Sequence, residues 1–225
     1  MLDSAFSVFS QGRNFARIVE GLWVTLEISA VSVLLSLILG LIAGLIMTAK
    51  ETLGATAIRL YFELIRFTPI LVLLYLFYYS LSRAWGINLD AKVVAILVFT
   101  LWGTAEMADL VRGAVTSISV HQRESGLALG LNESQINHYI VIPLAVRRLI
   151  PGVINLTTRM IKTTPYIFFI NVPELIKVGQ QVVELTGFKN KLASFWVYGF
   201  IFFIYFMVCF PISRYSSYLE KKWGG

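Results

Sequence analysis

The sequence predicts an all-α integral membrane protein with about five transmembrane helices. The chain of 225 residues is 57% hydrophobic and only 14% charged, whereas a soluble domain usually carries about 25% charged residues. Its mean hydropathy is +0.73. Several apolar runs reach the length of about 20 residues that a helix needs to cross a bilayer. These observations place the chain in the membrane.

The charge balance and the single cysteine narrow the function classes further. The net charge is +6, and excess Lys and Arg in a membrane protein generally set its topology, so we expect no nucleic-acid partner. Cys209 lies inside an apolar run and cannot form an internal disulfide. We interpret it as a small packing residue.

The first predicted span covers about residues 21–49. It lacks the basic start, short apolar core and cleavage site of a signal peptide. Residues 1–20 mix phenylalanines with Arg13 and Arg17, a pattern that favours a helix or loop lying on the membrane surface.

Four further spans follow, one of which is especially rich in basic residues. They cover about 57–82, with an interruption by RFTP at Arg66–Pro69, 91–116, 144–172 and 193–215. The run at 144–172 holds two prolines and four basic residues, namely Arg147, Arg148, Arg159 and Lys162. A helix with so many charges must face protein or water rather than lipid.

Basic residues indicate the orientation weakly. The segments 50–59 and 112–148 and the tail from residue 214 together hold nine Lys and Arg, and the segments on the other side hold seven. The positive-inside rule therefore favours the first group on the cytoplasmic side.

The connector at residues 121–143, HQRESGLALGLNESQINHYIVIP, is mostly polar in an otherwise apolar chain. Gly130 stands where a helix would stop, because glycine adopts the left-handed conformation without steric cost. Asn132 with Gln135 three residues later forms a capping-box pattern for a second helix, which Pro143 should end. A long, capped, amphipathic connector favours a docking surface over an ordinary solvated loop. We expect His121 and His138 to be docking or solvated residues.

The same connector resembles the EAA loop of ABC importer permeases, which reads E-A-A, three residues, G, nine residues, I-x-L-P. Here Glu124-Ser125-Gly126 is followed after three residues by Gly130 and after nine more by Ile140-Val141-Ile142-Pro143. Ser125 and Gly126 replace the alanines, and Ile142 replaces the leucine.

The resemblance extends over nearly the whole chain, to the polar amino-acid uptake branch of these permeases. The segments EGLWVTLEISAVSVLLSLILGLIAGL, YFELIRFTPILVLLYLFYY, AEMADLVRGAV and LIPGVINLTTRMIKTTPYIFFINVPELIK carry it. The departures lie where a substrate path would run: Phe67 replaces a glycine, Glu106 a tyrosine, Asp109 a glutamate, Thr163 an aspartate and Pro165 a serine.

The resemblance implies a type I importer permease fold, with a single domain over 1–225 and a cytoplasmic coupling loop at about 117–143, in the bacterial cytoplasmic (inner) membrane. It implies a pair of cytoplasmic ATP-binding subunits, a second permease subunit that is identical or different, an extracytoplasmic amino-acid-binding protein, and membrane lipid as partners. ATP and Mg would bind the ATPase, with no cofactor on this chain. The ATPase-docking residues would be Glu124, Ser125, Gly126, Leu127, Gly130 and Leu131.

The sequence itself agrees with a separate energy source, because it contains no G-x-x-x-x-G-K-[ST] phosphate loop. A gradient-driven secondary transporter or small channel is the alternative, but we find no inverted repeat, and the polar connector would lack a role. A structural subunit without a substrate path is a third class, disfavoured by the charges in the spans. The sequence offers no catalytic residue and no metal-ligand spacing.

Ionisable residues within spans are costly and point to function. The candidates for a substrate path are Glu106, Asp109, Arg66, Trp102, Arg159 and Lys162. Internal salt bridges are the alternative role for the charged ones. A carboxylate at Glu106 would favour a cationic or amino-bearing ligand, and Tyr61, Phe62 and Trp102 could supply apolar walls or cation–π contacts. Gly40 and Gly44 form a G-x-x-x-G pair that packs helices either within or between subunits.

Overall fold

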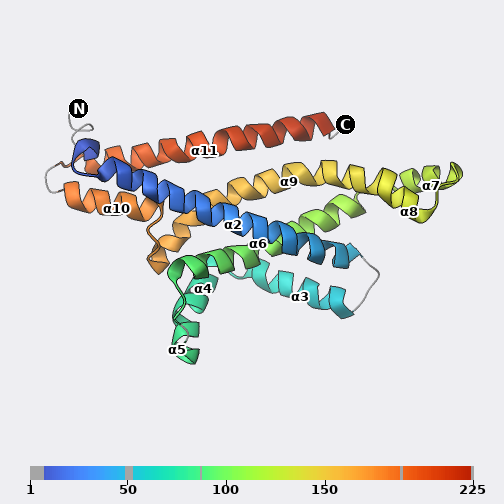
Figure 1. Ribbon diagram of the computed structural model, residues 1–225, viewed down its shortest axis with the longest axis horizontal. Helices are drawn as coiled ribbons and strands as arrows, with labels where there is room; N and C mark the ends of the chain where they lie inside the picture. The colour runs from blue at the N-terminus through green and yellow to red at the C-terminus, as the bar shows by residue number, and fades with distance from the viewer. Residues whose placement is uncertain (1–7, 49–52, 87, 188–189, 224–225) are drawn as a thin grey trace. The chain divides into compact units, whose positions relative to one another are not determined.

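A computed structural model describes residues 8–48, 53–86, 88–187 and 190–223 (Figure 1). Within these ranges every regular element is a helix. In chain order they are α2 (Asn14–Thr48), α3 (Leu53–Phe67), α4 (Ile70–Tyr75), the π-helix η1 (Leu76–Ser80), α5 (Leu81–Trp85), α6 (Ala91–Thr116), α7 (Val120–Ala128), α8 (Glu133–Ile136), the π-helix η2 (Asn137–Val141), α9 (Ile142–Thr163), the 3₁₀-helix η3 (Thr164–Ile170), α10 (Leu175–Thr186) and α11 (Ala193–Trp223).

The prediction of about five spans is confirmed. Four segments of the described chain are long and apolar enough to cross a membrane, and a fifth span results if the broken pair Gly54–Phe67 and Ile70–Ser80 counts as one. The break falls at Thr68 and Pro69, inside the predicted interruption, because a proline disfavours the helical conformation of the residue before it.

Two predicted helix ends differ from the structure. Residues 14–20 belong to the long helix α2 rather than to a surface segment, because Ile18 is fully buried there and Asn14 Nδ2 donates to the Val8 carbonyl over 2.9 Å. Helix α11 continues to Trp223, beyond the predicted end at 215.

The prediction that Pro143 ends the second helix of the connector is wrong. The π-helix η2 leads directly into α9, and Pro143 is the second residue of α9. A proline in the first turn of a helix is tolerated.

The described chain divides into two compact units. Unit 1 comprises 1–32, 70–99 and 159–211, and unit 2 comprises 33–69, 100–158 and 212–225. Helices α2, α6, α9 and α11 each contribute residues to both.

In unit 1, α10 lies beside the N-terminal half of α2 (Figure 1) and also packs on α11. Ile18, Val178, Val182, Val197 and Ile201 form the shared apolar core. A methyl group on Gly179 would lie 2.3 Å from Ile201 Cδ1, so a larger residue here would require the Ile201 side chain to shift. The sequence analysis did not predict α10.

Glu174 fixes the start of α10. Its side chain is fully buried and accepts hydrogen bonds from the backbone N–H groups of Ile176 at 2.9 Å and Lys177 at 2.7 Å. The Leu175 N–H donates to Thr25 Oγ1 on α2 over 3.2 Å. These bonds satisfy the first backbone donors of the helix, which otherwise have no partner.

In unit 2, the G-x-x-x-G pair of α2 packs against α6 of the same chain. A methyl group on Gly40 would lie 2.5 Å from Met107 Cβ, and one on Gly44 would lie 2.6 Å from Val111 Cβ. Ser36 Oγ donates to the Thr100 carbonyl over 3.3 Å. The small residues thus serve packing within the subunit.

Candidate functional site

The connector folds as a hairpin of α7, α8 and η2 (Val120–Val141), all within unit 2. Gly130 follows the C-cap of α7 with φ +80°. Its N–H donates to the Leu127 carbonyl over 2.9 Å, and the Leu131 N–H donates to the Gly126 carbonyl over 3.1 Å. This pair of bonds is the usual way in which a left-handed glycine ends a helix. The predicted glycine stop is confirmed.

The second arm starts at the predicted cap. Asn132 Oδ1 accepts from the Gln135 N–H, and Gln135 Oε1 accepts from the Asn132 N–H, both over 2.9 Å. These reciprocal bonds make a complete capping box.

The two arms of the hairpin, α7 and α8, lie side by side in Figure 1, and side-chain contacts hold them together. Gly126 is buried against Ile136, and a methyl group added to it would lie 2.9 Å from Ile136 Cγ1. Arg123 Nη2 donates to Asn137 Oδ1 over 2.9 Å, and Arg123 Nη1 lies 3.6 Å from Glu133 Oε2. The hairpin is therefore a closed unit.

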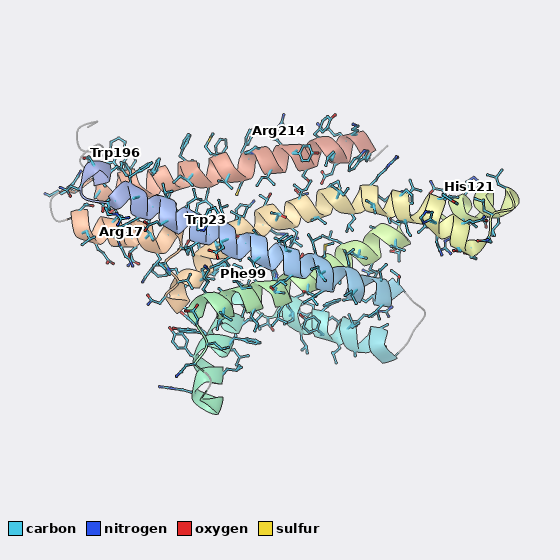
Figure 2. All side chains as sticks on the ribbon, in the orientation of Figure 1. Arg17, Trp23, Phe99, His121, Trp196 and Arg214 are labelled. Carbon is cyan, nitrogen blue, oxygen red and sulfur yellow. The ribbon has the colours of Figure 1, made fainter. Side chains whose placement is uncertain are left out.

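The outer surface of the hairpin carries large apolar side chains. Leu127 is 51% exposed and Leu129 81%. Glu124, Ser125 and Gly130 are also exposed, and Leu131 is half-buried. Of the six predicted docking residues, Gly126 alone is buried, so it supports the hairpin from inside. His121 (Figure 2) and His138 are exposed on the hairpin.

A second feature of unit 2 is a cluster of charged side chains on α3 and α6. Asp109 Oδ1 lies 2.6 Å from Arg112 Nη2, and Asp109 Oδ2 lies 3.5 Å from Arg66 Nη1. Arg59 and Glu63 join these three side chains around a hollow of about 290 Å³. Two of the predicted path residues, Arg66 and Asp109, are thus brought together by an ion pair.

Glu106 and Asp109 share a neighbouring hollow of about 310 Å³ with Ser117 and Arg148. Arg148 Nη1 donates to Ser117 Oγ over 2.7 Å. Glu106 is half-buried. The hollow thus offers two carboxylates and one guanidinium to a small charged molecule.

The predicted aromatic wall residues have packing roles in unit 2. Trp102 packs beside Met107 and Leu156. Phe62 is 4% exposed in a second core cluster, and Tyr61 Oη donates to the Leu101 carbonyl over 3.0 Å.

Arg159 and Lys162 lie on the last turns of α9 in unit 1, both exposed. The structure therefore groups Arg66, Trp102, Glu106 and Asp109 in one unit and these two residues in the other.

Sequence reasoning missed two charged residues beside the predicted ones. Arg59 and Glu63 line the first hollow, and their spacing of four residues, followed by Arg66 three later, was a signal that they share one helix face. Arg112 pairs with Asp109 from three residues along the same helix.

Comparisons with known proteins agree with this architecture. A family model described as "Binding-protein-dependent transport system inner membrane component" matches residues 13–224. The glutamine transport system permease protein GlnP of Escherichia coli strain K12 is 30% identical over 206 residues, which are 91% of this chain and 92% of that protein. The probable glutamine ABC transporter permease protein GlnP of Bacillus subtilis strain 168 is 29% identical over 90% of this chain and 92% of its own length.

The fold has a solved counterpart. A chain from the "Crystal structure of an amino acid ABC transporter with histidines" superposes with a TM-score of 0.83 at 24% identity, over 92% of this chain and 94% of that one. The chain therefore belongs to the family of binding-protein-dependent transport system inner membrane components, as a multi-pass inner-membrane permease subunit that is not itself the ATPase.

Proposed function

We propose that this chain is the transmembrane subunit of an ATP-driven importer for a polar amino acid, in which the hairpin is the coupling element. The observation that carries the proposal is the closed geometry of the hairpin. Its glycine turn and capping box hold the two arms together, while Leu127, Leu129 and Glu124 remain exposed. A rigid amphipathic projection of this kind fits the role of a helix that sits in a groove of a partner.

The partner in the proposal is a cytoplasmic pair of ATP-binding subunits, which hold ATP and Mg²⁺. The family description already implies an ATPase and a binding protein in such systems. Closure of the ATPase pair would move each hairpin as a rigid body, and α9, which continues from η2 without interruption, would follow. The open side of the pathway would then alternate.

A second permease subunit completes the pathway in this proposal. Five spans enclose little by themselves, so two copies, or this chain and a different one, would frame the cavity. An extracytoplasmic binding protein would deliver the substrate to the outer side.

An amino acid is the proposed substrate class. The names of the two relatives give glutamine as their substrate, and the name of the solved transporter gives an amino acid. The charges of unit 2 suit a zwitterion: Glu106 and Asp109 can accept hydrogen bonds from an ammonium group, and Arg148 can donate to a carboxylate. We propose Glu106, Asp109 and Arg66 as path residues, with Trp102 as packing support and Arg159 and Lys162 as contributors from α9.

Reconstitution tests the proposal. The chain is copurified with its ATPase, placed in liposomes with its binding protein, and assayed for uptake of labelled amino acids with ATP inside the vesicles. We expect uptake that requires ATP hydrolysis and the binding protein. Uptake driven by an ion gradient in the absence of the ATPase would instead establish the gradient-driven transporter.

A further inference from the structure

A basic groove lies between α9 and the end of α11 in unit 2, apart from the hairpin. It has a volume of about 330 Å³ and is lined by Arg147, Arg148, Pro151, Gly152, Glu220 and Trp223. The coupling role does not use it, and the proposed substrate path shares only Arg148 with it.

Hydrogen bonds fix the two walls of the groove. Ser216 Oγ on α11 is buried and donates to the Pro151 carbonyl on α9 over 2.9 Å. Asn155 Nδ2 donates to Glu220 Oε1 over 3.0 Å. Because these bonds join the helices directly, the groove is a formed feature rather than a gap that side-chain motion would close.

The groove attracts negative charge. The ion pairs found among the described residues include neither Arg147 nor Arg148. Arg148 uses one donor on Ser117 Oγ, and a guanidinium has five N–H donors, so most of them stay available. Lys221 and Lys222 stand beside Trp223 on the same helix end. The single carboxylate of Glu220 does not neutralise these four cations.

The length of α11 indicates that the groove lies outside the hydrocarbon core, on the headgroup side. Helix α11 has 31 residues, about 46 Å at ~1.5 Å per residue, so it exceeds a hydrocarbon core of about 30 Å. The residues that extend beyond the core are those after Arg214, because the apolar run ends there. Tyr215 and Tyr218 are 57% and 56% exposed in this part, as expected of aromatic residues at a membrane interface.

We infer that this groove binds the phosphate of an anionic phospholipid headgroup in the cytoplasmic leaflet. Arg147 and Arg148 donate to the phosphate oxygens, a geometry that guanidinium groups suit. Glu220 accepts from a headgroup hydroxyl such as those of glycerol, and Trp223 covers the headgroup edge. Basic pockets between membrane helices on the cytoplasmic side recognise anionic lipids by this chemistry.

Lipid titration of the purified, delipidated chain tests the inference. Binding of phosphatidylglycerol, phosphatidylethanolamine and phosphatidylcholine is measured by native mass spectrometry for the wild type and for Arg147→Gln/Arg148→Gln. We expect the wild type to prefer phosphatidylglycerol and the double variant to lose affinity about thirtyfold, from about fivefold per basic side chain near a membrane surface.

The matched control is Lys221→Gln/Lys222→Gln, which removes the same amount of charge from the end of α11, outside the groove lining. It should retain most of the affinity. An equal loss in the control would show diffuse attraction and overturn the groove as the site. Equal binding of phosphatidylethanolamine would overturn the anionic specificity.

Two further measurements complete the test. If the double variant does not fold, as judged by size-exclusion profile and melting temperature, the single change Arg147→Gln should lower affinity about fivefold. An excess of inorganic phosphate at constant ionic strength should not displace the lipid. Displacement would identify free phosphate as the ligand and overturn the lipid assignment.

Discussion

Gly126 on α7 lies directly against Ile136 on α8, so closely that an added methyl group would come within 2.9 Å of Ile136 Cγ1. This contact, rather than the outer surface, accounts for a small residue at this position of the hairpin. The two arms could not approach if Gly126 carried a bulky side chain.

Gly126→Val should therefore open the hairpin. Overpacking of this kind costs about 1–3 kcal/mol, and hydrogen exchange of residues 120–141 should rise. Gly113→Ala is the matched control, since no atom outside its helix lies within 4 Å of an added methyl group. Unchanged exchange in the Gly126 variant would contradict the contact.

Gly130→Val should uncouple ATP hydrolysis from transport while the chain still inserts. The residue has φ +80°, and the left-handed conformation costs an ordinary residue about 1–2 kcal/mol. Gly130→Asn should be tolerated better, because asparagine adopts this conformation more readily. The measurement is transport-coupled ATPase activity in the reconstituted complex, and wild-type coupling in the Val variant would remove the role of the turn.

Glu124→Lys should sharply reduce copurification of the ATPase. Glu124 is exposed on the hairpin, and a reversed charge at an interface can cost several kcal/mol, roughly. Glu184→Lys is the control, as Glu184 is an exposed glutamate on α10 in unit 1. If the Glu124 variant keeps its ATPase as well as the control does, docking rests on the apolar side chains of Leu127 and Leu131 instead.

Glu106→Gln should severely lower amino-acid uptake per folded molecule, because it removes a charge from the hollow of unit 2 while keeping the side-chain size. Basal ATPase activity and folding should persist. Glu27→Gln is the control for a purely structural role, because it breaks the 2.7 Å ion pair with Lys92. We expect it to lower the melting temperature and to leave uptake per folded molecule unchanged. That pattern in the Glu106 variant would refute substrate contact.

Stability should fall as pH rises from about 5 to about 7.5, because of Glu174. Burial raises the pKa of this carboxyl, which lies outside the spans, from 4.5 to about 7. Between these values the unfolded state has lost the proton that the folded state keeps, so rising pH favours unfolding, by up to roughly 3 kcal/mol. Glu174→Gln should flatten the melting temperature over this range. An equally steep profile in the variant would assign the dependence to other groups.

Local features of the fold were predictable from the sequence. Hydrophobic runs of sufficient length place the spans, and the limits of α6 agree with prediction at both ends. Gly130 and the Asn132–Gln135 capping box form hydrogen bonds only with residues close by in the sequence. Their residue types are therefore enough to locate the turn. The proposed docking role of Glu124 and Leu127 rests on the same short pattern.

Contacts between distant segments depended on the tertiary structure. Asp109 could have paired with any basic residue, and only folding places Arg66, 43 positions away, beside it. The early start of α2 accompanies the burial of Ile18 against α10, and the Ser216 bond joins the C-terminal part of α11 to α9. The lipid groove joins residues 147–152 to 220–223. No local sequence pattern predicts these contacts between distant residues, because their energy arises only when two helices meet. The sequence by itself determined which segments become helices, and packing decided which side chains share a site.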